Sequence, residues 1–68
     1  MKLELVYLDC FETEFKDQKY CVYRFLEPQS LQVLTGTNLN LSFEQYKHYI
    51  AIVEWKNRKL KVTSITNK

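Results

Sequence analysis

The 68-residue chain has few of the residues that mark many specialised proteins: one glycine, one proline, two cysteines and one histidine. A single glycine excludes collagen-like sequences and Gly-rich phosphate-binding loops. No apolar run approaches the ~20 residues that a membrane-spanning helix needs. The first residues also lack the apolar core of a signal peptide. We therefore expect a cytoplasmic protein with no membrane segment.

The two thiols and the single imidazole do not form a recognisable chemical motif. A zinc site needs about four clustered ligands, and Cys10, Cys21 and His48 are too few and too dispersed. If residues 16–19 form a hairpin turn, Cys10 lies opposite Phe25 and away from Cys21, which predicts reduced, buried cysteines. His48 is accompanied by no Ser-His-Asp order, no evident pair of carboxylates and no HExxH motif. We therefore expect no enzymatic activity, no cofactor and no metal.

The residues that are present predict one small, mainly β domain over residues 1–68. Hydrophobic residues make up 46% of the chain and aromatic residues 15%, which is enough to form a core. Residues 2–15 are β-rich, but their alternation changes phase, which predicts a β-bulge in one long strand. Residues 20–26 and 31–35 have the composition of two further strands. Gly36 would end the third strand in a left-handed conformation.

The second half of the chain predicts a helix and a hairpin. Ser42 followed by Gln45 is a capping-box pattern, which indicates a short helix around residues 42–48. Residues 49–55 and 60–65 have the composition of two strands, and a loop at residues 57 and 58 sets their register. In that register we assign to the core the face that carries three opposed pairs: Trp55–Leu60, Val53–Val62 and Ala51–Ser64.

The order strand, strand, strand, helix, strand, strand matches a five-stranded OB-like barrel (β-β-β-α-β-β). Closure of the sheet removes exposed strand edges and encloses apolar side chains in a short chain. Two other architectures fit less well. An SH3-like barrel lacks the long first strand, and an open α+β sheet is the third alternative.

Residues 54–65, Glu-Trp-Lys-Asn-Arg-Lys-Leu-Lys-Val-Thr-Ser-Ile, resemble the last hairpin of small OB-fold single-stranded-DNA-binding proteins of phages and mobile elements. The resemblance covers most of the chain by topology and only this hairpin by residue pattern. It implies a non-catalytic protein that binds single-stranded nucleic acid, with DNA as the expected form.

The distribution of charge favours the same function more than the net charge of +2 does. Residues 1–46 carry a net charge of −3 and residues 47–68 a net charge of +5. In such a barrel, basic loops would contact phosphates while aromatic side chains on the sheet stack on bases. The stacking candidates are Tyr7, Phe11, Tyr23 and Arg24. The phosphate-binding candidates are Lys16, Lys19, Lys56, Arg58 and Lys59.

Self-association is also expected, because one OB barrel covers only about 4–16 nucleotides. The alternative function is a protein–protein interaction module, such as a phage-type inhibitor of a host enzyme or a subunit of a larger assembly. Residues 20–26 support that alternative because both faces of this strand are apolar, and exposed apolar patches mark partner sites. A barrel that binds a small molecule is a third option, for which no convergent polar cluster is visible.

Overall fold

The computed structural model describes residues 1–37, 39 and 42–66 of the protein, and it is mainly β. Five strands follow one another: β1 (Lys2–Phe15), β2 (Gln18–Glu27), β3 (Gln32–Thr37), β4 (His48–Lys56) and β5 (Lys59–Thr66). The described residues contain no helix, and therefore none that is long and apolar enough to cross a membrane. The expected five strands are thus confirmed.

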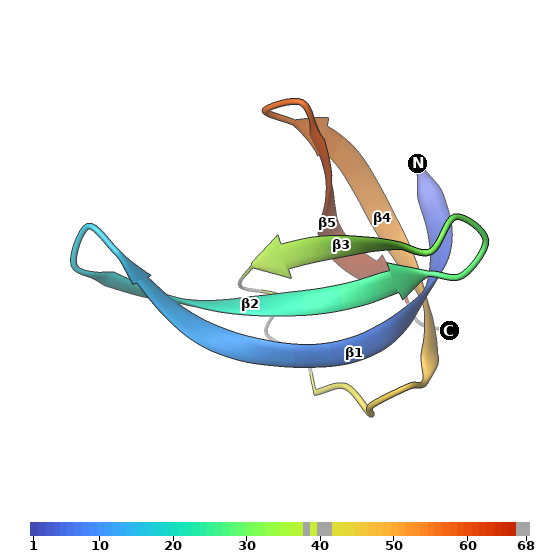
Figure 1. Cartoon of the computed structure of the whole chain (residues 1–68), viewed down its shortest axis with the longest axis horizontal. Helices are drawn as coiled ribbons and strands as arrows, with labels where there is room; N and C mark the ends of the chain where they lie inside the picture. The colour runs from blue at the N-terminus through green and yellow to red at the C-terminus, as the bar shows by residue number, and fades with distance from the viewer. Residues whose placement is uncertain (38, 40–41, 67–68) are drawn as a thin grey trace.

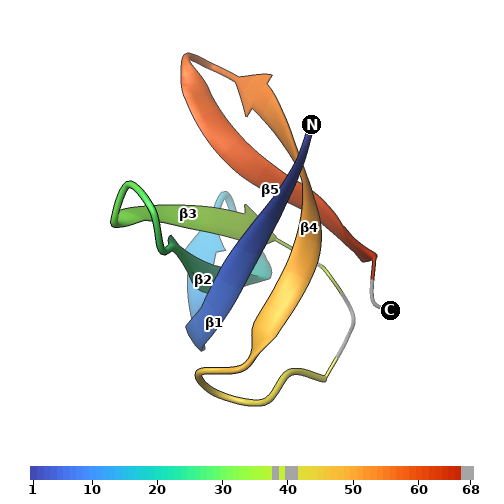
Figure 2. The same ribbon diagram turned by 90° about the vertical axis from the view of Figure 1, so that its right-hand side faces the viewer.

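The five strands close into a ring in the order β1-β2-β3-β5-β4, with β4 returning to β1 (Figures 1 and 2). Every neighbouring pair is antiparallel except β3 and β5, which run parallel. This parallel contact, which we call the seam, consists of the pairs Thr35–Lys61 and Gly36–Val62. The seam is the shortest pairing in the ring.

Gly36 lies inside β3 at the seam, and the strand does not end there. The sequence-based expectation of a left-handed conformation is wrong, because the φ angle of Gly36 is not positive and the residue lies inside β3. A Cβ atom at this position would meet the backbone oxygen of Val62 at 2.7 Å. Glycine is therefore required because β5 approaches the backbone of β3 so closely.

The long first strand contains the expected bulge. Its register against β2 shifts between Tyr7 and Asp9, so the strand pairs with β4 before the bulge and projects with β2 after it. The hairpin turn is tighter than expected: it has two residues, Lys16 and Asp17, with φ angles of 52° and 65°. These angles match a type I′ turn, whose twist suits a two-residue hairpin.

A loop replaces the helix expected around residues 42–48. Tyr46 has a φ angle of 65°, and its N–H donates a 2.7 Å hydrogen bond to the carbonyl oxygen of Tyr7. The N–H of Tyr7 in turn donates to the carbonyl oxygen of Lys47 at 3.0 Å. The segment thus continues the β1–β4 pairing, and these tertiary bonds outweigh a capping signal for a helix too short to be stable alone.

Phe43 packs its ring against the core and so attaches this loop to the rest of the protein. Its ring centroid lies 5.1 Å from that of Tyr7, 5.2 Å from Tyr49, 5.4 Å from Tyr23 and 5.6 Å from Phe25. Three of these four contacts are edge-to-face, a favourable geometry for aromatic pairs. The phenylalanine therefore packs among the aromatic side chains of the ring from a loop, in the segment where a short helix was expected.

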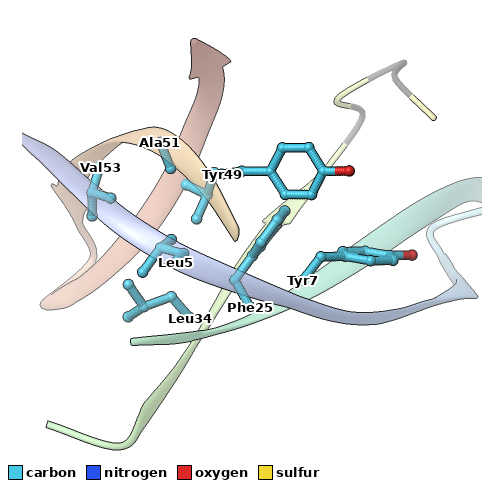
Figure 3. Close-up of a cluster of buried hydrophobic side chains, with 8 residues drawn as sticks. Leu5, Tyr7, Phe25, Leu34, Tyr49, Ala51 and Val53 are labelled. Carbon is cyan, nitrogen blue, oxygen red and sulfur yellow. The ribbon is translucent and has the colours of Figure 1, made fainter. Parts of the chain in front are cut away.

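The core lies inside the ring and contains contributions from all five strands (Figure 3). Its buried members are Leu5, Tyr7, Phe25, Leu34, Tyr49, Ala51, Val53 and Val62. In the last hairpin the register expected near the turn is confirmed, including Val53 opposite Val62. A second irregularity, at Thr63, makes Ala51 face Ile65 instead of Ser64. The shift brings an apolar side chain onto the core face, where Ile65 packs.

Candidate functional site

The β4–β5 hairpin extends beyond the ring (Figures 1 and 2). The pairing of β4 with β1 ends at Ile52, and the N–H of Val53 donates a last bond to the carbonyl oxygen of Met1 at 2.7 Å. On the other side, the seam begins only at Lys61. In the described part of the chain, residues 54–60 therefore project without pairing to any strand outside their own hairpin.

Trp55 is exposed because of this projection. It lies on the same face of β4 as Val53, but Val53 is 1% exposed and Trp55 is 67% exposed. The sequence analysis predicted a core position for Trp55, and that prediction is wrong. Alternation gave the correct face, but the side chain lies beyond the end of the ring.

A groove lies between this projecting hairpin and β3. Residues 32–35 form one side, and residues 55 and 58–61 form the other. The groove has a volume of about 480 Å³, with Leu34 and Leu60 supplying apolar surface and Gln32 and Thr35 supplying polar groups. Trp55 is its aromatic side chain. The groove forms where two parallel strands diverge from the short seam.

The groove is bordered by positive charge. Arg58, Lys59 and Lys61 line it, and Lys56 lies opposite Lys59 across the hairpin. Glu54 is the cross-strand neighbour of Lys61. Among the described residues, however, no carboxylate lies within 4.0 Å of any of these four cations. Their charges are therefore available to an anionic ligand.

The turn of this hairpin is built like the turn of the first. Asn57 and Arg58 have φ angles of 51° and 66°, which match a type I′ turn. The loop has the two residues expected from the sequence. Because Arg58 is itself a turn residue, its position relative to the groove is set by a regular backbone geometry.

Two of the expected phosphate-binding lysines do not join this site. Lys16 and Lys19 lie at the tip of the β1–β2 hairpin, which projects away from the β4–β5 hairpin in Figure 1. Lys19 pairs across the strands with Glu14, and Lys16 places its Nζ 5.3 Å from the ring centroid of Phe15. With Asp17 in the same turn, this tip carries no excess of positive charge.

Two of the expected stacking residues are occupied in the core. Tyr7 is 7% exposed and packs against Phe25, as Figure 3 shows, and burial raises the pKa of its phenol. Tyr23 is half-buried, and its ring centroid lies 5.4 Å from Phe43 and 6.4 Å from Tyr7. Burial also raises the pKa of Tyr23. Tyr7 precedes the bulge and lies in phase with the buried Leu5, so it faces the core, and neither tyrosine offers a free face for a base.

The other two stacking candidates, Phe11 and Arg24, lie on the outer surface of the β1–β2 pair. Phe11 is 49% exposed. Arg24 forms a bidentate pair with Asp9: Nε donates to Oδ1 at 2.7 Å and Nη2 to Oδ2 at 2.6 Å. These bonds lower the pKa of the Asp9 carboxyl and raise that of the guanidinium. Arg24 is therefore already paired and lies outside the groove.

The cysteines and the histidine form no reactive cluster in the described part of the chain. Cys10 lies opposite Tyr23, so the expected pairing with Phe25 is wrong, and Cys21 lies opposite Glu12. The two thiols do not meet, and both are free. The prediction that both are buried is wrong for Cys10, which is exposed on the β1–β2 hairpin, and Cys21 is only half-buried. No three His, Cys, Asp or Glu side chains of the described residues gather as metal ligands.

The sequence analysis missed the groove's neutral side and its aromatic residue. Trp55 could have been found from its position two residues before the hairpin loop, where a short ring cannot cover it. Lys61 could have been found as a continuation of the basic hairpin. No local signal marks Gln32 or Thr35, because they join the site only through the parallel seam.

Comparison with protein-family models, with curated proteins and with solved structures found no match for this chain. The function must therefore be inferred from the groove and its charges.

Proposed function

We propose that the protein is an OB-like barrel that binds single-stranded nucleic acid, with DNA as the expected form, in the groove between β3 and the β4–β5 hairpin. The observation that carries this proposal is Trp55, 67% exposed and bordered by cations that no described carboxylate neutralises. The strand order, the bulged first strand and the parallel seam support the OB-like architecture. The proposed role is non-catalytic and cytoplasmic.

The proposed binding mechanism combines base stacking on the indole of Trp55 with contacts between basic side chains and phosphates. An unpaired base stacks on Trp55, which contributes about 1–3 kcal/mol per base in proteins of this kind. Arg58, Lys59 and Lys61 contact the phosphates that flank this base. A duplex is excluded because its bases are stacked on one another and present no free face to the indole. Stacking does not depend on base identity, so sequence preference is expected to be weak.

The sole tryptophan provides a direct test of this mechanism. Titration of the protein with an unlabelled single strand should quench the fluorescence of Trp55, and the matching duplex should not. Anisotropy of a labelled strand of about 20 nucleotides measures the affinity in parallel. Trp55→Ala should weaken binding by about 5- to 150-fold, which corresponds to ~1–3 kcal/mol.

Salt dependence tests the contribution of the cations. If three cations contact phosphates, the logarithm of the affinity should fall with the logarithm of salt concentration at a slope of about −2. Charge reversal of Lys56, Arg58 and Lys59 to Glu should abolish binding. The matched control is reversal of Lys16 and Lys19, which should change the affinity far less. Equal losses from both sets would show general charge attraction and would contradict a specific groove.

A protein–protein interaction module remains the second candidate function, as an inhibitor of a host enzyme or a subunit of an assembly. The observation that favours it is the exposed aromatic surface of the β1–β2 hairpin, where Phe11 and Phe15 are 49% and 61% exposed. This function is favoured if neither a single strand nor a duplex binds even at low salt.

A further inference from the structure

The β1–β2 hairpin projects from the ring as a two-stranded arm (Figure 1). The pairing of β1 with β4 ends at Val6, and the pairing of β2 with β3 ends at Val22. Beyond these residues, apart from the two bonds that join the backbone of Tyr7 to Tyr46 and Lys47, the two strands pair only with each other in the described part of the chain. A ribbon of two strands is marginally stable in water unless one of its faces is covered.

The two faces of this arm differ in charge. One face continues the core side of the sheet through Tyr23 and carries Glu12, Glu14 and Lys19. The other, which we call the neutral face, carries Phe11, Thr13, Phe15, Gln18, Tyr20 and Val22. None of these six side chains is charged at neutral pH, and Lys16 lies beside them at the tip, where its Nζ is 5.3 Å from the ring centroid of Phe15.

The neutral face is apolar and open. Phe11 and Phe15 are 49% and 61% exposed, unusual values for side chains of this size. The hydroxyl of Tyr20 donates a 2.8 Å hydrogen bond to the Oε1 atom of Gln18, so contact with the ring of Tyr20 leaves no hydroxyl proton unpaired. Arg24, which borders the face, is held by Asp9. The surface therefore suits an uncharged protein face better than a nucleic acid.

The register makes the neutral face complementary to itself. Each pair of opposed residues joins a large side chain to a smaller one: Phe11 to Val22, Tyr20 to Thr13, and Phe15 to Gln18. The large members alternate between the two strands. When a second arm is turned about an axis parallel to the strands, each large side chain lies over a smaller one. A symmetric dimer requires this type of self-complementary surface.

We propose that a second copy of the chain docks on the neutral face, so that two arms pack face to face around a twofold axis. This proposal does not depend on nucleic-acid binding. Edge-to-edge pairing of two β1 strands is disfavoured, because Asp9, Glu12 and Glu14 would bring like charges together. Face-to-face packing places no charged side chain of the neutral face in the interface.

Sedimentation equilibrium of the full chain tests the proposal at concentrations up to about 1 mM, because an interface formed by only six side chains from each copy is small and binds weakly. The wild-type protein should form dimers. Phe11→Lys should raise the dissociation constant at least about tenfold, because a symmetric interface contains the substitution twice. Val22→Glu should have a similar effect. The matched control is Ile50→Lys, which changes an exposed apolar residue of β4 to the same cation and should leave the dimer unchanged.

Mixing the two variants tests the packing itself. In the proposed dimer, Phe11 of one copy lies over Val22 of the other. A mixture of the Phe11→Lys and Val22→Glu proteins should therefore form a heterodimer more readily than either variant forms a homodimer. Circular dichroism of each variant verifies the fold. A wild-type monomer at every concentration, a dimer that both variants leave intact, or a mixture without heterodimer would overturn the proposal.

Discussion

Gly36→Ala tests whether the seam closes the ring as tightly as the geometry indicates. The added Cβ would lie 2.7 Å from the backbone oxygen of Val62, 3.0 Å from its Cβ and 3.3 Å from Cδ1 of Leu39. An ordinary contact needs about 3.5 Å or more between such atoms. The nearest atom is backbone and cannot rotate away, so β3 and β5 must separate by several tenths of an ångström.

The expected loss of stability follows from two opposing effects. Overpacking of a rigid site costs about 1–3 kcal/mol. Replacement of glycine by alanine restricts the unfolded chain and returns about 0.4–1 kcal/mol. The net loss should be about 1–2 kcal/mol, from a total of only about 3–10 kcal/mol expected for a chain of this length. The melting temperature should fall by about 4–16 °C.

Urea unfolding followed by far-ultraviolet circular dichroism measures this change. The control is Thr37→Ala in the same strand, an exposed position where the change should stay within about 0.5 kcal/mol. Adding Val62→Ala should not restore stability to Gly36→Ala, because the two nearest atoms remain in alanine. An unchanged or raised unfolding midpoint for Gly36→Ala would refute the claim that the seam forbids a side chain here.

Three further changes test other parts of the structure. Phe43→Ala should lower the free energy of unfolding by about 2–4 kcal/mol, and Phe43→Leu by less, in the same urea assay. Trp55→Ala should change the free energy of unfolding by no more than about 0.5 kcal/mol because the side chain is exposed. A larger loss would show that Trp55 is buried in the core. Arg24 lowers the pKa of Asp9, so the stability that this pair contributes is present above the unfolded pKa of about 4 and is lost as the pH falls below it. The difference in urea midpoint between wild type and Asp9→Asn should therefore shrink on acidification.

The sequence predicted the features that depend on neighbouring residues. Alternation and turn composition identified five strands, and the phase change in residues 2–15 located a real bulge. The loop at residues 57 and 58 gave the correct register as far as Val53 and Val62. Beyond this pair the register failed, because the irregularity at Thr63 has no local signature in an evenly β-rich strand.

The errors concern contacts between distant segments. The capping-box pattern at Ser42 was outweighed by hydrogen bonds to Tyr7, 35 or more positions earlier in the chain. Alternation placed Trp55 on the core face, but only the ring's dimensions show that the core ends at Val53. Gly36 looked like a strand end because its near neighbour on β5 cannot be read from β3 alone.

The two projecting hairpins present different kinds of surface. Both have two-residue type I′ turns and both extend beyond the ring, so backbone geometry does not distinguish them. Their side chains do. The β4–β5 hairpin lies beside β3 and lines a groove with cations, whereas the arm stands alone with acidic residues on one face and none on the other. Phosphate is repelled from the acidic face, and on the neutral one it meets, among the described residues, a single cation outside an ion pair, Lys16 at the tip, whose Nζ lies over the ring of Phe15. A nucleic acid should therefore engage the β4–β5 hairpin alone, which leaves the arm available for a protein surface while the groove is occupied.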